Sequence, residues 1–241
     1  MFGDIRDPTT VNTAMEGCEA VFHLAAITDA RSGDDDAVYQ VNFLGSENVF
    51  KLAKNAGAKV IFTSSAAVYC ESRFSEDGDC SPISQYGKSK LKAEKALQKL
   101  GDAFIVRIFN AYGPKSSSVV NKFCSKIPNY QEVIVFGSGL QTRDFVHVND
   151  VVSALLLGLG NTGLYNVGTG KEISVLQLID LIHDITKSKP TMKFTPPIEG
   201  DIRRSRAEIG KIKALGWNPK LSLEDGIRTL LADMGWQPLQ I

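Results

Sequence analysis

The sequence predicts an α/β fold built on a Rossmann-like parallel sheet, followed by a smaller α+β portion. Between residues 20 and 109, short apolar runs alternate with segments of helical periodicity. The runs lack the polar alternation of a half-solvated strand, which is typical of strands buried on both faces. The order strand, helix, strand, helix, strand indicates crossovers on a parallel sheet. After Gly113-Pro114 the expected elements become shorter and mixed.

The first half of the chain contains three expected strands and two expected helices. The apolar runs that predict the strands are 20–26, 58–64 and 104–109. Residues 34–56 place apolar side chains on one helical face. Residues 84–100 are rich in Lys, Glu, Ala and Leu, which favour a helix.

The second half is expected to alternate short strands with helices. The expected strands are 133–136, 164–167 and 191–194, and the expected helices are 119–127, 149–159, 175–186, 207–215 and 223–234. This texture indicates an α+β portion that follows the parallel sheet.

Composition argues against several classes of protein. The 241 residues carry 27 Lys and Arg against 27 Asp and Glu, and zero net charge is not typical of a nucleic-acid or anionic-membrane binder. No apolar run approaches the roughly 18–20 residues that span a bilayer. The first residues contain no signal-peptide core, so we expect a cytoplasmic protein. The four cysteines form no Cys-x-x-Cys pair, so we expect no metal site.

A tyrosine and a lysine stand four residues apart at the start of the helix expected over 84–100. Residues i and i+4 share a helix face, so we expect Lys90 near the Tyr86 phenol. A nearby ammonium lowers the pKa of a phenol, which is otherwise near 10, toward the range of a useful base. Ser64 and Ser65 end the second strand, where open α/β sheets bind their ligands.

Taken alone, Tyr-x-x-x-Lys also fits a solvated helix face. The order of motifs is much rarer: a strand ending in Ser-Ser, then Tyr-x-x-x-Lys, then a strand ending in Arg-Ile-Phe-Asn. Over essentially the whole chain, this order resembles the extended short-chain dehydrogenase/reductases. Within them, the sequence is similar to the nucleoside-diphosphate-sugar epimerases of the NAD-dependent epimerase/dehydratase family, of the UDP-glucose 4-epimerase type.

The resemblance implies roles for individual residues. The residues that match catalytic positions are Ser65, Tyr86 and Lys90. Those that match cofactor-binding positions are Asp4, Ile5, Leu24, Ala25, Ala26, Asn42, Ser64, Tyr86, Lys90 and Phe109. Those expected to bind substrate are Ser65, Asn110, Arg143, Asp201 and Arg203. The two histidines that lie within motifs, His23 and His147, are expected to be structural.

The reaction implied by the resemblance is inversion at C4 of a sugar nucleotide, with NAD as the cofactor. Tyr86 would take the proton of the 4-hydroxyl while hydride leaves C4, and hydride returned to the opposite face of the 4-keto sugar would invert the centre. Arg143 suits a diphosphate because guanidinium is a permanent bidentate donor. The implied partners are a UDP-hexose and a second copy of the chain, bound through the helices expected over 34–56 and 84–100. No nucleic acid and no membrane is implied.

The sequence departs from the family pattern in three places that bear on function, one of which is Cys70, where the family usually has glycine. Ile198 stands where the family often has an arginine for the diphosphate, so Arg143 must carry more of this role, or Arg203 or Arg204 must substitute. The chain also contains no Gly-x-Gly-x-x-Gly loop near its start. Its first residues match a part of the family pattern that lies beyond the family's first βαβ unit. Such a start is expected of a fragment or of a reading frame that begins late. We therefore expect a partial NAD-binding Rossmann domain with the catalytic residues over 1–114. A mainly sugar-nucleotide-binding portion is expected over 115–241, of which about 137–160 returns to the Rossmann part.

Several alternatives remain open. Ala66 and Ala67 stand where dehydratases and decarboxylases of the family carry acidic residues, which argues against both reactions. A reductase would share the Ser, Tyr and Lys residues. A non-catalytic truncated homologue is favoured by the missing glycine loop and opposed by the intact catalytic residues. Ser205 stands where some epimerases carry a large aromatic residue, so N-acetylated sugars are possible substrates.

Overall fold

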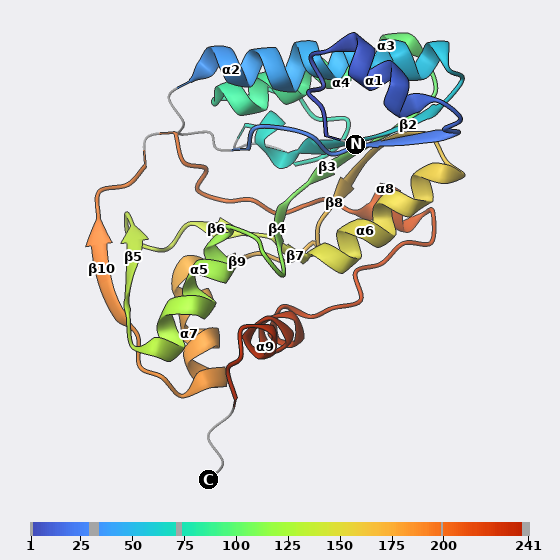
Figure 1. The fold of residues 1–241 in the computed structure, drawn as a ribbon. Helices are drawn as coiled ribbons and strands as arrows, with labels where there is room; N and C mark the ends of the chain where they lie inside the picture. The colour runs from blue at the N-terminus through green and yellow to red at the C-terminus, as the bar shows by residue number, and fades with distance from the viewer. Residues whose placement is uncertain (1, 29–33, 71–73, 199, 238–241) are drawn as a thin grey trace. The chain divides into compact units, whose positions relative to one another are not determined.

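The computed structural model describes residues 2–28, 34–70, 74–198 and 200–237. Within these residues the chain divides into two compact units, which are described one at a time (Figure 1). Unit 1 comprises residues 1–108 and 153–166, and unit 2 comprises residues 109–152 and 167–241.

Unit 1 is built on a four-stranded sheet with the order β1-β2-β3-β8. Its strands are β1 (Ala20–His23), β2 (Lys59–Ser65), β3 (Ala103–Ile108) and β8 (Gly163–Val167), the last of which ends in unit 2. β1 runs parallel to β2, and β2 runs parallel to β3, with Ile61 opposite both Phe22 and Phe104. This topology confirms the predicted Rossmann-like parallel sheet.

Helices cover both faces of this sheet. The helices of unit 1 are α1 (Pro8–Met15), α2 (Asp35–Tyr39), the π-helical turn η1 (Gln40–Gly45), α3 (Ser46–Asn55), η2 (Ala66–Val68), α4 (Gln85–Leu100), the end of α6 (Val148–Leu156) and η4 (Leu157–Leu159). α2, α3 and α4 lie together over one face (Figure 1), where Phe50 of α3 meets Phe62 edge to face at 5.2 Å. Neighbouring residues of a strand point to opposite faces, so Ile61 faces the other side. There η4 packs so closely that a Cβ at Gly158 would lie 2.6 Å from Ile61.

Unit 2 combines short strand pairs with three helices around a separate apolar core. Its elements are β4 (Asn110–Tyr112), α5 (Val119–Lys126), η3 (Ile127–Asn129), β5 (Glu132–Phe136), β6 (Thr142–Arg143), β7 (Phe145–His147), the start of α6, β9 (Ile173–Ser174), α7 (Val175–Thr186), β10 (Thr191–Thr195), α8 (Gly210–Lys213) and α9 (Leu223–Asp233). β4 pairs with β7 and β5 with β10, both in parallel, while β6 pairs with β9 in antiparallel. Residues of α5, α7 and α9 form the core, including Phe123, Ile179 and Leu230.

The structure differs from the sequence-based expectation in three elements of unit 1. The helix expected over 34–56 is interrupted by the π-helical turn η1. The strand expected over 20–26 ends at His23, where the Thr63 hydroxyl donates to the His23 carbonyl at 3.1 Å and ends the ladder. α1 was not predicted, although Asp7 caps it by accepting from Thr9 N and Pro8 occupies its first turn, which is a standard helix start.

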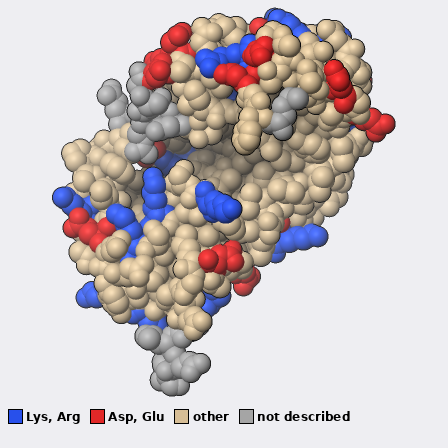
Figure 2. Space-filling model, viewed as in Figure 1, with Lys and Arg blue, Asp and Glu red and all other residues tan. Residues whose placement is uncertain are grey.

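The surface carries charges of both signs, which are interspersed on the face drawn in Figure 2. In the described part of the chain, no helix is both long and apolar enough to cross a lipid bilayer.

Candidate functional site

The three residues predicted to be catalytic lie together in unit 1. Ser65 is the last residue of β2, and its hydroxyl accepts a hydrogen bond from Ala67 N at 3.1 Å, which starts the turn η2. Tyr86 lies in the first turn of α4, and its phenol is hydrogen-bonded to the Ser65 side chain. Lys90 lies one turn further along α4 and is almost completely buried.

A glycine makes the contact between Ser65 and Tyr86 possible. Gly87 follows Tyr86, and a Cβ at this position would lie 2.1 Å from the carbonyl oxygen of Ala67. Any side chain would therefore push the start of α4 away from the turn that follows Ser65. The Ser84 hydroxyl caps the helix at this point by accepting from Gly87 N at 3.1 Å.

The expected effect of Lys90 on the Tyr86 phenol is not found. The Lys90 ammonium donates to the Thr63 carbonyl at 2.9 Å and lies 6.0 Å from the centre of the Tyr86 ring. Burial raises the pKa of Tyr86, and the hydrogen bond with Ser65 opposes this rise. The four-residue spacing puts Lys90 on the same helix face, but its side chain turns toward β2.

The Lys90 ammonium lies in a desolvated environment. Its side chain is 2% exposed, and the ammonium lies 4.9 Å above the ring of Phe62. Burial lowers the pKa of Lys90 to about 8, while the negative charge of Glu94 acts in the opposite direction. Near neutral pH the ammonium form still predominates.

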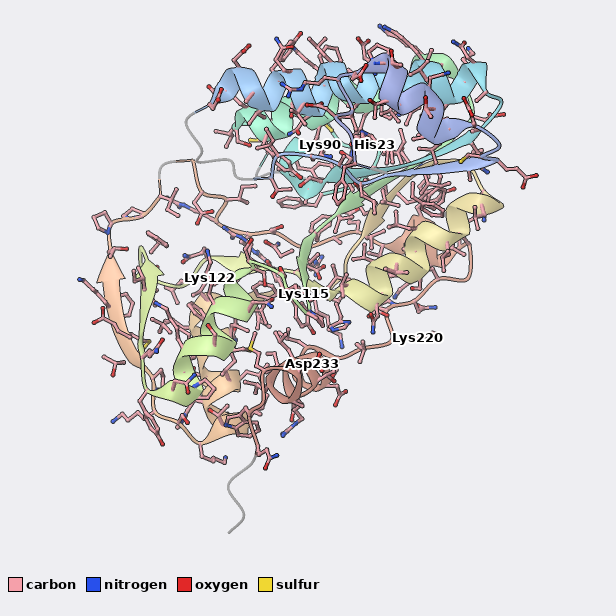
Figure 3. All side chains as sticks on the ribbon, viewed as in Figure 1. His23, Lys90, Lys115, Lys122, Lys220 and Asp233 are labelled. Atoms are coloured by element: carbon pink, nitrogen blue, oxygen red, sulfur yellow. The ribbon has the colours of Figure 1, made fainter. Side chains whose placement is uncertain are left out.

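His23, labelled with Lys90 in Figure 3, is a buried neutral group. It stacks on Phe62 at 5.5 Å, and its Nε2 is hydrogen-bonded to the Ser46 hydroxyl at 2.8 Å. Burial, with the positive charge of Lys90, lowers the pKa of His23 to about 3. These contacts agree with the structural role expected for this histidine.

Asn42 lies in the π-helical turn η1 and is completely buried. Its side-chain oxygen accepts from Ile27 N at 2.7 Å, and its side-chain nitrogen donates to Ile27 O at 2.8 Å. Asn42 therefore holds the segment that follows β1, which contains the predicted cofactor-binding residues Leu24, Ala25 and Ala26. π-helical turns are frequent at functional sites because they redirect side chains within a helix.

The other two predicted cofactor residues of the N-terminal segment are close to the same helix. Asp4 is exposed, and its hydrogen bonds from the side chain and backbone of Arg6 lower its pKa to about 2. Ile5 accepts from the Asn48 side chain through its carbonyl at 2.8 Å. A Cβ at Gly45 would lie 2.8 Å from the Ile5 side chain, so this glycine permits the close approach.

The predicted residues of unit 2 are held by backbone and side-chain hydrogen bonds. Phe109 N donates to Val167 O at 2.9 Å, and Asn110 N donates to Asp144 O at 3.0 Å. The Arg143 guanidinium donates to the Asp201 carboxylate at 2.5 Å and to Ile202 O at 2.6 Å.

A groove of about 940 Å³ in unit 2 contains the expected phosphate-binding segment. Asp201 and Arg203 line it, and so does Ile198, the apolar replacement for an expected arginine. Arg204 lines it too and forms an ion pair with Glu172. The groove therefore holds basic groups as well as the carboxylate that pairs with Arg143.

Asp144 is a residue that the sequence reasoning missed. Its fully buried carboxylate accepts from Thr169 N at 2.7 Å, Gly170 N at 2.8 Å and Ala207 N at 3.1 Å. It thereby fixes two loops next to Arg143. Asp144 directly follows Arg143, which the family resemblance singles out, and this adjacency is the signal in the sequence that could have identified it.

The comparisons with known proteins agree with this arrangement. The profile of the NAD dependent epimerase/dehydratase family matches residues 1–168. The chain belongs to this family. A UDP-glucose 4-epimerase of Mycolicibacterium smegmatis is 34% identical over 230 residues, which are 87% of this chain and 74% of that protein.

Solved structures of family members share the fold. The UDP-glucose 4-epimerase of Thermotoga maritima, crystallised with UDP-glucose, superposes with a TM-score of 0.91 at 31% identity, over 97% of this chain and 83% of that one. The UDP-glucose 4-epimerase of Thermus thermophilus, in complex with NAD, gives a TM-score of 0.88 at 28% identity, over 95% and 82%. The family is NAD dependent by its description, which confirms the cofactor expected from the sequence.

The residues of unit 1 fit the family's cofactor. Ser64 lies at the carboxyl end of β2, and its buried hydroxyl has no hydrogen-bond partner among the described residues. Leu24, just beyond the carboxyl end of β1, leaves 56% of its surface exposed. Both groups lie at the edge of the sheet where a dinucleotide binds. The unpartnered hydroxyl can form a hydrogen bond with it, and the exposed apolar side chain can pack against it.

Proposed function

We propose that this member of the NAD-dependent epimerase/dehydratase family is a nucleotide-sugar 4-epimerase, acting on UDP-glucose and UDP-galactose or their N-acetyl forms. The observation that carries the proposal is the hydrogen bond between the Ser65 and Tyr86 side chains at the carboxyl end of β2. Two hydroxyls at one point form a site for a single sugar hydroxyl that must lose and regain its proton.

Each side chain has a distinct task in this reaction. Bound NAD would supply reversible hydride transfer at the sugar carbon. Tyr86 takes the proton of the 4-hydroxyl through its phenol oxygen, and Ser65 holds the same sugar oxygen by a hydrogen bond. Tyr86 must lose its own proton first, and the hydrogen bond with Ser65, which lowers the pKa of Tyr86 against the effect of burial, favours the phenolate.

The proposed substrate contacts lie in unit 2. Arg143 offers a bidentate guanidinium to the diphosphate, and its ion pair with Asp201 holds it in one orientation. Asn110 and Arg203 would bind the remainder of the nucleotide sugar. The Thermotoga maritima enzyme, crystallised with UDP-glucose, supports a UDP-hexose as the substrate.

The turn after Ser65 favours epimerisation over elimination of water. Ala66 and Ala67 form this turn and have methyl side chains. Elimination requires an acid and a base besides the tyrosine, and neither residue supplies one. A reductase remains compatible with the same groups, and the experiment below separates it.

The test is turnover of UDP-glucose, UDP-galactose and the two N-acetylhexosamine analogues by the protein with NAD. We expect interconversion of at least one pair without net formation of NADH. Tyr86→Phe should lower kcat by about 10²–10⁴-fold with an unchanged melting temperature, whereas Tyr130→Phe, a change at an exposed tyrosine of unit 2, should leave kcat unchanged. No interconversion of any pair would contradict the proposal, and stoichiometric reduction of the supplied NAD to NADH would indicate a reductase working in reverse.

We also propose that two copies of the chain associate through α3, α4 and the turn η1. Phe43 of η1 and Ala96 of α4 line the same shallow groove on this face, and Leu44 beside them is exposed. Pairing of such faces between two copies buries the same residues twice, as in other twofold dimers.

A further inference from the structure

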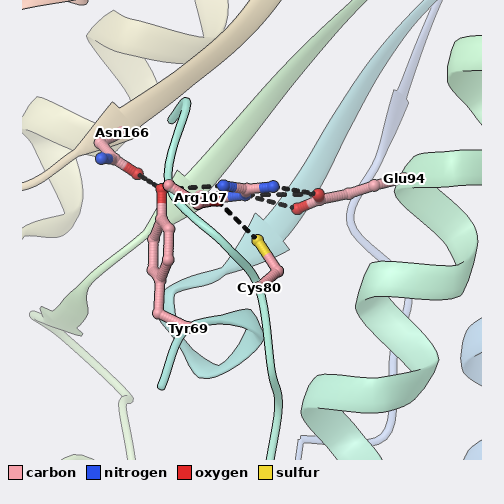
Figure 4. Close-up of polar contacts among 6 residues, drawn as sticks. Tyr69, Cys80, Glu94, Arg107 and Asn166 are labelled. Carbon is pink, nitrogen blue, oxygen red and sulfur yellow. Dashed lines mark hydrogen bonds and ion pairs between the residues drawn. The ribbon is translucent and has the colours of Figure 1, made fainter. Parts of the chain in front are cut away.

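A buried ion pair joins strand β3 to helix α4 in unit 1 (Figure 4). The Arg107 guanidinium of β3 donates to the Glu94 carboxylate of α4 through Nε at 3.0 Å and through Nη2 at 2.7 Å. Glu94 is 1% exposed and Arg107 is 4% exposed. A bidentate pair with this degree of burial fixes both side chains in one geometry.

The ion pair continues into a chain of hydrogen bonds. Arg107 also donates to the hydroxyl of Tyr69 at 2.9 Å, and that hydroxyl donates to Asn166 of β8 at 2.7 Å. Asn166 in turn donates to Phe74 O at 2.8 Å. Cys80 also contacts the Arg107 guanidinium (Figure 4).

This network reaches α4, which carries Tyr86 and Lys90, and the end of the turn that follows Ser65. Glu94 is four residues beyond Lys90 on the same buried face of α4. Tyr69 directly follows the turn η2, which Ser65 caps at its start. Arg107 therefore connects the helix of Tyr86 and Lys90 with the backbone that places Ser65.

We propose that Glu94, held by Arg107, is a positioning residue that fixes the buried ammonium of Lys90, and that Arg107 and Tyr69 fix the turn after Ser65. A stabilising role alone would not require these charges. Removing two ions from water is costly, and a buried pair is often no more stabilising than apolar side chains of similar size.

Among the groups around Lys90, Glu94 is the one that favours its charged form. The groups that face the ammonium are the Thr63 carbonyl and the Phe62 ring of β2, His23 of β1, and Tyr86 and Glu94 of α4. His23 is neutral, since its pKa is about 3. Glu94 thus opposes the loss of the Lys90 proton that burial favours.

The first test measures the Lys90 ammonium itself and needs no turnover. In protein labelled with ¹³C at the lysine Cε, the Lys90 signal is identified by its loss in Lys90→Met, and its titration is followed by NMR. We expect Glu94→Gln to lower the Lys90 midpoint by about one pH unit, since the negative charge of Glu94 raises the pKa of Lys90. Glu224→Gln, which removes an exposed i,i+4 ion pair of α9, should leave the midpoint unchanged.

The second test separates positioning from stability. The double variant Glu94→Gln/Arg107→Met removes both buried charges, so its melting temperature should recover relative to Glu94→Gln. The Lys90 midpoint should stay low in the double variant. A midpoint that is unchanged in Glu94→Gln, or that returns to the wild-type value together with the melting temperature, would overturn the proposal.

The third test rests on the proposed function. In Glu94→Gln, the alkaline limb of the pH profile of kcat for the UDP-hexose should move to lower pH. The shift should equal that of the NMR midpoint, and KM should change little. A limb that does not follow the Lys90 midpoint would also contradict the positioning role. If wild-type protein turns over no UDP-hexose, the proposed function fails, and the NMR titration still decides the role of Glu94.

Discussion

Lys90 carries its charge in an environment that disfavours it. Its ammonium is buried against the Phe62 ring and has one backbone carbonyl, that of Thr63, as its hydrogen-bond acceptor. Burial moves the pKa of Lys90 from the ordinary 10.5 to about 8. The protonation of this one group therefore changes with pH differently in the folded and the unfolded chain.

That difference predicts a pH dependence of stability. Between pH 8 and 10.5 the unfolded chain holds a proton on Lys90 that the folded chain has lost, so stability from this group rises with pH over this window. The gain is at most about 3 kcal/mol, and it disappears as the pH falls below 8. It is measured as the difference in urea unfolding free energy between wild type and Lys90→Met at pH 7.5, 8.5 and 9.5.

Other groups also titrate in this range, and the comparison of wild type with Lys90→Met cancels their contribution to the unfolding free energy. Tyr69, whose pKa burial raises to about 12, lowers the stability at high pH in both proteins. A difference between wild type and Lys90→Met that is constant over the three pH values would contradict a depressed pKa of Lys90.

The site could be predicted from the sequence at some residues and not at others. The pairing of Ser65 with Tyr86 follows from the end of one strand and the start of the next helix, because parallel strands bring their carboxyl ends to the same edge. The direction of Lys90 could not be predicted. A four-residue spacing defines a shared helix face, but the acceptor of the ammonium is a backbone carbonyl of another element.

Among the elements, the turn η1 has the most specific task. Asn42 within it forms both hydrogen bonds of its amide with the backbone of Ile27, fifteen residues earlier. The carbonyl of Asn42 accepts from the Ser46 hydroxyl at 2.7 Å, and Ser46 is also bonded to His23. One turn of helix thereby holds the end of β1 and the segment after it.

We predict that Asn42→Ala releases this segment. The amide and carbonyl of the partly buried Ile27 would lose their partners, which costs about 1–3 kcal/mol, and the Ile27 amide proton should exchange with deuterium faster. Asn48→Ala, which removes a comparable side-chain bond to Ile5 O, should leave exchange at Ile27 unchanged. Unchanged protection of the Ile27 amide in Asn42→Ala would contradict the clamp.

The elements that could be predicted are those with a simple period. The strands β2 and β3 each contain a run of consecutive apolar residues because both faces of the sheet are covered, and that pattern is visible without a structure. The turn η1 could not be seen, since a single wider turn leaves the apolar positions of a long helix nearly in place. The short strands β6 and β9 consist of two residues each, which is too little for any period.

At the scale of the whole molecule, the chain divides where β3 ends. Unit 1 takes the segment 153–166 from the second half of the sequence, and Gly158 within it approaches Ile61 and Phe104 of the sheet. Residues 137–152, which were also expected to return to the Rossmann part, are grouped with unit 2. The functions assigned to the two parts stay predictions.

The proposed dimer gives a prediction at this scale. Ala96→Arg would place a bulky charge in the groove shared with Phe43, so the mass measured by light scattering should fall from that of a dimer to that of a monomer. Ala232→Arg, at an exposed alanine of α9, should leave the dimer intact. A monomeric wild-type protein, or a dimeric Ala96→Arg variant, would contradict an interface on this face.

The π-helical turn η1 limits which insertions and deletions the chain tolerates. A π-turn contains one residue more than the α-turn it replaces, so the direction of Asn42 depends on the number of residues in 40–45 as well as on their identity. Deletion of the exposed Leu44 would let the helix close into regular α-turns and rotate one side of it by about 100° relative to the other. Either Asn42 would then leave Ile27, or the buried face of α3 would leave the sheet. In this segment, a one-residue deletion at the surface would be more damaging than most substitutions in the core.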